Sequence, residues 1–262
     1  MAARAVSGSC SPSELLIAVI ARLLEGCRHV AVGSQSPIPG SAALLARELS
    51  RAGPDGGERE PMRVSVLGSR RNNFFTSGGV ELFDLAAQGR IDAFFLGGGQ
   101  IDGEANINLT GTGDWPGTRV RWPGAFGSAF LYFLVPRVIL FREEHTRRVL
   151  VPKVDIVTAP GTSAEGVHRP GGPYALLTGL ALFSFDKSRR RFRLESVHAG
   201  HTVEEVLDNT GFEFDRAQRV PETPPPEAGR LALIRGKVRD EIAEIYPRFA
   251  AALVTADRAS PS

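Results

Sequence analysis

Predicted helices and short apolar strands alternate through the first half of the chain. Amphipathic runs with a spacing of 3.6 residues predict the helices, and the first begins with Ser11, Pro12 and Glu14, which is typical of a capped helix start. We expect helices at residues 12–25, 41–49 and 80–88, and strands at 29–32, 64–67 and 91–96. This alternation predicts an α/β fold, in which helices cover the faces of a sheet.

The second half is richer in predicted strands. We expect them at residues 138–141, 154–157, 181–185 and 192–197, with a hairpin turn at 186–191. Thr202 can cap a helix that ends near Gly211, and the proline-rich connector Pro221–Pro226 precedes a further helical stretch, Leu231–Ala251, interrupted by Pro247. Because no shift of composition marks a boundary, residues 1–262 are expected to form one domain. Its core would cover about residues 12–216, and residues 217–262 would be a connector and a helical extension.

Composition excludes several classes of function. The 262 residues carry a formal net charge of only +2, which argues against a nucleic-acid-binding protein. The two cysteines, Cys10 and Cys27, have no spacing typical of a disulfide framework or a zinc site. The longest apolar runs fall short of a membrane span, and the first residues do not resemble a signal peptide. We therefore expect a cytoplasmic protein.

A glycine turn directly after a predicted strand is the first candidate site. Gly97, Gly98 and Gly99 are followed by Gln100, and backbone amides at such a strand end could hold a carbonyl group or an oxyanion. A tight turn without a ligand explains the same residues equally well. The spacing matches neither a dinucleotide-binding fingerprint nor a phosphate-binding loop. Asp102 and Glu104 are the nearest carboxylates, although hydrogen bonding within a turn accounts for them too.

A second small-residue loop, Trp122–Ala129, also follows a predicted strand. It could line a narrow substrate channel or form a plain turn, and Ser128 lacks the Gly-x-Ser-x-Gly context of a hydrolase nucleophile. Arg70 and Arg71 follow the strand at 64–67, where they could recognise an anion or lie in an ordinary surface loop. His198 and His201 have no acidic partner at a fixed spacing, so no metal site is predicted.

Taken in order, these segments resemble the β-type subunits of family I coenzyme A (CoA) transferases, and in particular the glutaconate CoA-transferase group. The resemblance covers about residues 12–216. It is carried by Glu81–Asp84, Gly89–Asp92, Gly97–Asp102, Asn106–Asn108, Pro123–Gly127, Val151–Gly161, Thr202–Val206 and Thr210–Glu213.

The resemblance implies a three-layer α/β fold of the CoA-transferase type (the NagB/RpiA/CoA transferase-like fold) with a β-rich second half. It also implies an α-type partner subunit and an acyl-CoA site between the two chains, with the CoA thioester as substrate and no other cofactor. Neither nucleic acid nor a membrane is an expected partner. The residues that it assigns to acyl-CoA binding are Gly33, Gly97, Gly98, Gly99, Gln100, Asn106, Gly124, Phe126 and Gly127. Bulky substitution at Gly98 or Gly127 is expected to lower turnover more than stability.

One departure from the family pattern bears on the chemistry. Family members attack the thioester with a glutamate in a Glu-x-Gly motif. The corresponding position here reads Leu67-Gly68-Ser69, and no glutamate occurs between Met62 and Gly79. Ser69 has no visible base partner, so the catalytic residues stay unassigned. Phe126 also replaces a glycine of the second loop, and Glu104 precedes an alanine where the family has a glycine.

Several functions remain open under this resemblance. One is a transferase subunit, and another is a diverged subunit of an acyl-CoA hydrolase that opens a carbon ring or of a decarboxylase. The third is a non-catalytic subunit whose α-type partner carries the chemistry. A stand-alone sugar-phosphate isomerase of the same fold group would need a pair of carboxylates near a phosphate loop, and no such set can be placed in the sequence.

Overall fold

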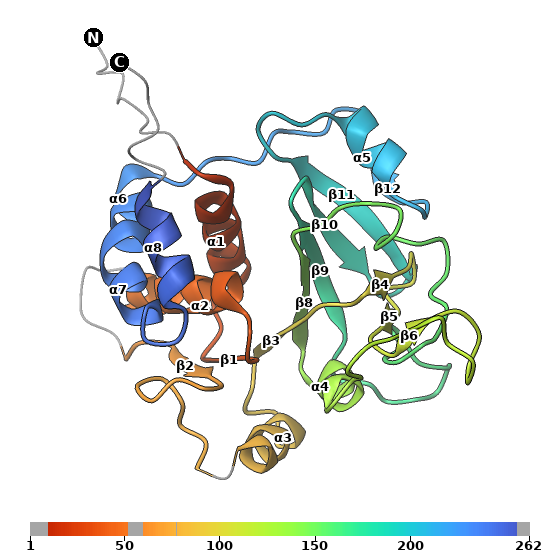
Figure 1. The fold of residues 1–262 in the computed structure, drawn as a ribbon, viewed down its shortest axis with the longest axis horizontal. Coiled ribbons are helices and arrows are strands. Elements are labelled where there is room, and N and C mark those ends of the chain that lie inside the picture. The colour runs from red at the N-terminus through yellow and green to blue at the C-terminus, as the bar shows by residue number, and fades with distance from the viewer. Residues whose placement is uncertain (1–9, 52–59, 77, 256–262) are drawn as a thin grey trace. The chain divides into compact units, whose positions relative to one another are not determined.

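The computed structural model describes residues 10–51, 60–76 and 78–255, and the chain divides into two compact units (Figure 1). Unit 1 joins the described residues up to Thr76 with those from Pro224 onward, and unit 2 holds the residues between them. The single domain expected from the sequence stays a prediction. Within the described ranges, no helix is long and apolar enough to cross a membrane.

Unit 1 contains two parallel strands and two groups of helices. β1 and β2 pair in parallel, with Val30 opposite Val64, and all but the first residue of β2 are buried. The elements are α1 (Pro12–Leu23), β1 (His29–Val32), α2 (Pro37–Ser50), β2 (Arg63–Val66), α6 (Ala228–Leu233), the π-helical turn η1 (Ile234–Val238), α7 (Arg239–Ile242) and α8 (Pro247–Thr255).

Helix α1 begins as the sequence predicts. The Ser11 hydroxyl accepts a hydrogen bond from the Glu14 amide, and the Glu14 carboxylate accepts one from the Ser11 amide, which completes a capping box. The second helix starts four residues before its predicted start, because Pro37 supplies the first helical φ angle and the chain can turn there.

The helices after Pro224 pack on α1 and α2 of the same unit (Figure 1). Arg235 forms an ion pair with Glu14 on α1, and Lys237 forms one with Glu48 on α2. The predicted helical stretch is therefore present, with the expected interruption before Pro247, and it belongs to a packed unit.

Unit 2 is built on a mixed sheet. Within this unit the strand order is β12-β11-β10-β9-β8-β3, in which β3, β8 and β9 run parallel and β10 is antiparallel to both of its neighbours. Short pairs formed by β4 with β5 and by β6 with β7 stand apart from it. The elements are α3 (Gly79–Ala87), β3 (Ala93–Leu96), β4 (Gln100–Ile101), β5 (Ile107–Asn108), β6 (Gly111–Thr112), β7 (Val120–Arg121), α4 (Ser128–Leu134), β8 (Arg137–Arg142), β9 (Pro173–Thr178), β10 (Ala181–Asp186), β11 (Arg191–Val197), α5 (Val203–Asn209) and β12 (Asp215–Arg216).

One predicted strand of this unit is wrong, and the six-residue strand β9 was not predicted, nor were the two-residue strands β4, β5, β6 and β12. Residues 154–157 form no strand, because the amides of Val154 and Asp155 donate to the side chains of Asp102 and Gln100 instead of to a neighbouring strand. Strand β9 lies at the centre of the sheet, between β8 and β10. It begins directly after a Gly-Gly pair and with a proline, a combination that is not typical of the start of a central strand.

Acid should destabilise unit 2 through His145. This side chain is buried between Thr178 and Thr210, and burial lowers its pKa to about 4 from an ordinary value of 6.5. The unfolded chain therefore binds a proton at a pH where the folded chain does not, so stability is complete above about pH 6.5 and falls as the pH drops toward 4. We expect this group alone to remove about 3 kcal/mol over that range.

Urea unfolding of the wild-type chain and of His145→Gln between pH 7 and pH 4 measures this contribution. The wild-type chain should lose more stability on acidification than the variant does. Equal pH dependence in the two proteins would show that His145 is not the group responsible.

Candidate functional site

The predicted glycine turn lies at the carboxyl end of β3. The Gly99 amide donates to the carbonyl of Asn108 at 2.9 Å, so it is not open to a thioester carbonyl. Gln100 is 7% exposed, and its Oε1 atom accepts from Asn108 Nδ2 at 2.8 Å and from the Asp155 amide at 2.9 Å. Gln100 thus holds three segments together, and its assignment to acyl-CoA binding stays a prediction.

The second predicted loop packs directly against this turn. A Cβ atom placed on Gly99 would lie 2.3 Å from the Trp122 ring, so only glycine allows the indole to approach. The amides of Trp122 and Gly124 donate to the carbonyls of Thr110 and Leu109, at 3.0 and 3.1 Å. The structure therefore brings together the two loops that the sequence singled out. The amides of Gly99 and Gly124 both donate to the segment Asn108–Leu109, which thereby holds the two loops.

Glycines 98 and 127 both lie where a side chain would meet a neighbouring group. A Cβ atom at Gly98 would meet the Gln100 carbonyl oxygen at 2.6 Å, and one at Gly127 would meet the Phe83 ring at 2.1 Å. A bulky residue at 98 is expected to lower stability as well as turnover, because the backbone there cannot admit it. At 127 the ring of Phe83 would have to move, and the expectation that turnover falls more than stability stays a prediction there.

Phe126 is held in an unusual position in the second loop. Its φ angle is +47°, in the left-handed region, which costs a non-glycine residue about 1–2 kcal/mol. Its side chain is 88% exposed and lies 5.6 Å from the Phe83 ring, measured between centroids. Phe130 (46%) and Val80 (61%) are also exposed, and together with Phe126 we call them the α3–α4 apolar surface. Gly127, by contrast, is half-buried.

Asp102 and Asn106 build the turn after β4. Asp102 is 4% exposed, and its carboxylate accepts from the amides of Glu104 and Asn106 and from Asn106 Nδ2. Asn106 Oδ1 accepts from the Gly161 amide at 3.0 Å. Hydrogen bonding within the turn, one of the two roles left open for Asp102, thus accounts for these contacts. The polar atoms of the Asn106 side chain also bond within the protein, and its role toward acyl-CoA stays a prediction.

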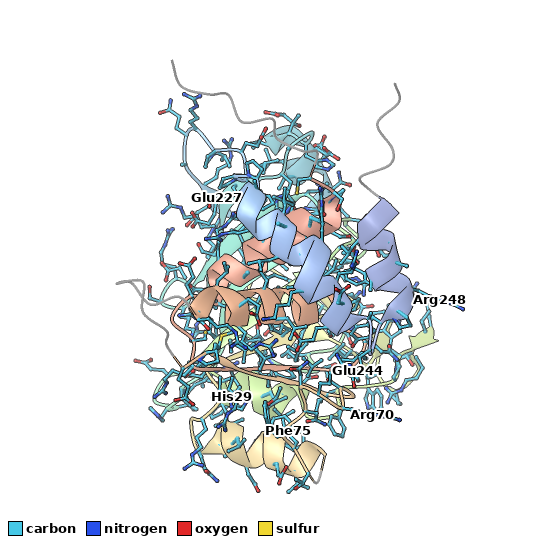
Figure 2. The ribbon with its side chains drawn as sticks, turned by 90° about the vertical axis from the view of Figure 1, so that its left-hand side faces the viewer. His29, Arg70, Phe75, Glu227, Glu244 and Arg248 are labelled. Atoms are coloured by element: carbon cyan, nitrogen blue, oxygen red, sulfur yellow. The ribbon has the colours of Figure 1, made fainter. Side chains whose placement is uncertain are left out.

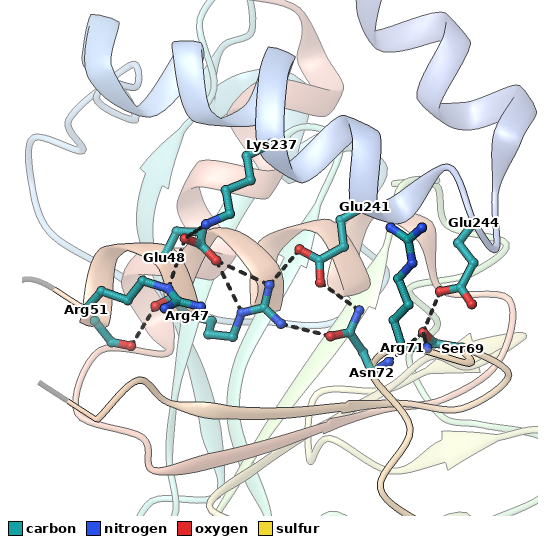
Figure 3. A network of polar contacts seen from close by, with 10 residues as sticks. Arg47, Glu48, Arg51, Ser69, Arg71, Asn72, Lys237, Glu241 and Glu244 are labelled. Atoms are coloured by element: carbon teal, nitrogen blue, oxygen red, sulfur yellow. Dashed lines mark hydrogen bonds and ion pairs between the residues drawn. The ribbon is translucent and has the colours of Figure 1, made fainter.

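The turn after β2 occupies the position where the resemblance places the family glutamate. Leu67 is half-buried and Gly68 is exposed at φ +91°, while Ser69 is 4% exposed. The Ser69 hydroxyl donates to Glu244 Oε2 at 2.8 Å (Figure 3). The expectation that Ser69 lacks a base partner is therefore wrong. Nothing in the sequence pairs these two residues, because 175 positions separate them.

Gly33 also belongs to unit 1, where it follows β1 and is half-buried. The other residues assigned to acyl-CoA lie in unit 2. The two remaining histidines of interest are accounted for by local contacts. His198 is buried and contacts Thr223 and the Thr178 carbonyl, and His201 pairs with Glu205.

Comparison with known proteins identifies the family. The model of the coenzyme A transferase family matches residues 58–209. The chain is 32% identical over 244 residues to a 3-oxoadipate CoA-transferase subunit of Pseudomonas knackmussii, and the match covers 86% of this chain and 92% of that protein. The chain belongs to the coenzyme A transferase family. Within that family it is a β-type subunit of family I, as its motifs predict.

Other relatives are named for different activities. The cholesterol ring-cleaving hydrolase IpdB subunit of Rhodococcus jostii is 30% identical over 159 residues, covering 59% of this chain and 62% of that protein. The crystal structure of the decarboxylase AibA/AibB superposes with a TM-score of 0.72 at 24% identity, covering 94% of this chain and 99% of the matched chain. The crystal structure of glutaconate coenzyme A-transferase from Acidaminococcus fermentans superposes with a TM-score of 0.73 at 22% identity, covering 87% of this chain and 95% of the matched chain, which confirms the predicted α/β fold of the CoA-transferase type.

Proposed function

We propose that this chain is the β-type subunit of a heteromeric enzyme that acts on an acyl-CoA thioester. The observation that carries the proposal is the meeting of the Gly97–Gln100 turn with the Trp122–Gly124 loop at the carboxyl end of β3. Ligands of open α/β sheets bind at such strand ends, and small residues there let a narrow chain approach the backbone. Both loops carry motifs of the family, and the thioester itself is the only cofactor-like group required.

The usual covalent transfer is not expected on the turn after β2. Leu67 offers no nucleophile. Ser69 Oγ accepts hydrogen bonds from the amides of Arg71 and Asn72 at 3.2 and 2.8 Å and donates its proton to Glu244. A hydroxyl oxygen has two lone pairs, and both are used here, so neither is left to attack a thioester carbon. This favours hydrolase or decarboxylase chemistry over ordinary transfer. The relative from Rhodococcus jostii is named a hydrolase subunit, in the same direction, whereas the relative from Pseudomonas knackmussii is named a transferase subunit.

An α-type subunit is the proposed partner. The α3–α4 apolar surface exposes large side chains of Phe126, Phe130 and Val80 that a partner chain would cover. The complex of AibA with AibB is a two-component precedent among the solved structures. The single chain is therefore expected to be poorly active. Co-expression with the product of the neighbouring gene should give a stable complex, and full activity of the purified single chain would contradict the proposal.

No acyl-glutamyl or glutamyl-CoA adduct should form on this chain, because the family position carries Leu67. The complex is incubated with its acyl-CoA, treated with hydroxylamine or borohydride, and mapped by peptide mass spectrometry. A glutamate-dependent transferase run in parallel shows that trapping works. An adduct on a carboxylate of this chain would support ordinary covalent transfer and contradict this prediction. Turnover without any adduct would support the hydrolase or decarboxylase alternatives. If every activity survives loss of the two loops, the chain is a non-catalytic subunit.

A further inference from the structure

The turn after β2 is closed by its own backbone and by a carboxylate from the C-terminal helices. The Val66 amide donates to the Asn72 carbonyl at 2.7 Å, and the Ser69 amide donates to the Val66 carbonyl at 3.1 Å. Glu244 lies in the segment between α7 and α8. Its Oε1 accepts from the Arg70 amide at 2.8 Å, as its Oε2 does from Ser69. Figure 2 shows Glu244 and Arg70 next to each other.

Glu244 is exposed, so its position depends on these hydrogen bonds. The slight burial of Glu244 against the turn would by itself raise its pKa, but the hydrogen bonds from the turn and the charge of Arg71 outweigh it and hold the pKa below its ordinary value. The carboxylate is therefore ionised at neutral pH and able to accept from several donors of the turn at once.

Glu241 of α7 and Tyr246, just before α8, contact residues that follow the two strands of unit 1. Glu241 accepts from Asn72 Nδ2 at 2.9 Å, and Arg47 donates to both Glu241 and Asn72 (Figure 3). The hydroxyl of Tyr246 accepts from the Ser36 amide at 3.0 Å, beyond the carboxyl end of β1. Residues 241–246 thus contact the segments that follow both parallel strands of unit 1.

We propose that Glu244 is a positioning residue, which fixes the Ser69–Asn72 turn so that Arg70 and Arg71 present their guanidinium groups to the phosphates of coenzyme A. This rests on the proposed acyl-CoA function. Both arginines are exposed, and they follow the carboxyl end of a parallel strand, where ligands of α/β sheets bind. Guanidinium groups suit phosphate through paired N–H donors, provided that the backbone holds them in place.

Whether Glu244→Ala weakens or strengthens coenzyme A binding distinguishes a positioning role of Glu244 from a purely electrostatic one. Glu244 places a negative charge beside Arg71, so its removal would strengthen phosphate binding if charge alone mattered. If Glu244 orders the turn, Glu244→Ala weakens coenzyme A binding despite that gain. We expect about a tenfold loss of affinity, which corresponds to ~1.4 kcal/mol.

The test titrates free coenzyme A into the co-expressed complex by calorimetry. Glu227→Gln is the control, because this exposed glutamate opens α6 at the far end of the C-terminal helices without a side-chain capping bond (Figure 2). Glu244→Ala should bind coenzyme A more weakly than wild type, and acetate should restore part of the affinity by filling the space of the lost carboxylate. Ser69→Ala should weaken binding as well. Unchanged or tighter binding by Glu244→Ala would overturn the proposal.

Hydrogen exchange keeps the test independent of the proposed function. Amides 70–72 should exchange faster in Glu244→Ala than in wild type or Glu227→Gln, with the rest of unit 1 unchanged. If the wild-type complex does not bind coenzyme A, the proposed function and the role of the two arginines fail together. If these amides stay protected in Glu244→Ala, the positioning role fails even when coenzyme A binds.

Discussion

Arg235→Ala should lower the free energy of unfolding by about 3–5 kcal/mol, because it leaves a buried carboxylate without its cation. The Glu14 side chain is fully buried, and its two oxygens accept from Arg235 Nε at 2.6 Å and Nη2 at 3.1 Å. Burial alone would raise the pKa of Glu14, but the Arg235 hydrogen bonds, together with those from Ser11, outweigh it and hold the pKa below its ordinary value. The pair therefore joins the C-terminal helices to the start of α1.

Urea unfolding at pH 7 measures this effect, with Arg239→Ala as the control. Arg239 pairs only with Asp240 in the described contacts, and that carboxylate is 66% exposed, so its loss should cost no more than about 0.5 kcal/mol. The double variant Glu14→Gln with Arg235→Met should recover much of the stability, since it removes both charges. A loss below about 1 kcal/mol for Arg235→Ala would mean that Glu14 finds water or another donor.

Asp102→Ala should be destabilising by about 4 kcal/mol, because several N–H groups lose their acceptor at once. The amides of Glu104 and Asn106 donate to Asp102 Oδ1 at 3.1 and 3.0 Å, and Asn106 Nδ2 donates to Oδ2 at 3.1 Å. These donors lie in a turn where Asp102 itself is 4% exposed. Asp102 therefore acts as the acceptor around which the turn is built.

Glu104→Ala is the matched control, because this neighbouring carboxylate is exposed. It should change stability by less than about 0.5 kcal/mol. Thermal unfolding and urea titration of both variants decide between the two roles that the sequence left open for Asp102. A stable Asp102→Ala protein that loses only turnover would identify Asp102 as a catalytic residue, contrary to the structure.

Local signals in the sequence were enough to predict much of the fold. The Ser11 cap, the buried strands around Val30 and Val66, and the hairpin after Phe185 depend on neighbours a few residues apart, and the structure has them. Strand β9 was not predicted. Its apolar run follows two glycines, and the sequence of one strand does not show that the strand lies at the centre of a sheet.

The candidate site was predictable only in part. Glycine runs identified the two loops, but the reason for Gly99 is the Trp122 ring, whose contact crosses twenty-three positions. The contact of Ser69 with Glu244 crosses 175, so it depends on how the C-terminal helices pack. The sequence has Leu67 where the resemblance places a glutamate, and only the packing of the C-terminal helices brings another carboxylate, Glu244, to the same turn.

The π-helical turn η1 affects the direction in which the residues after it point. One turn of this kind accommodates an extra residue, and each residue of an α-helix advances the side-chain direction by about 100°. Five residues in this wider turn rotate the chain about as far as four residues of a regular α-helix, so η1 absorbs one residue without changing the direction of the side chains that follow. If the same five residues formed regular α-helix, Glu241 and Glu244 would face elsewhere. The contact of these two carboxylates with the turn after β2 therefore depends on η1 keeping its wider turn.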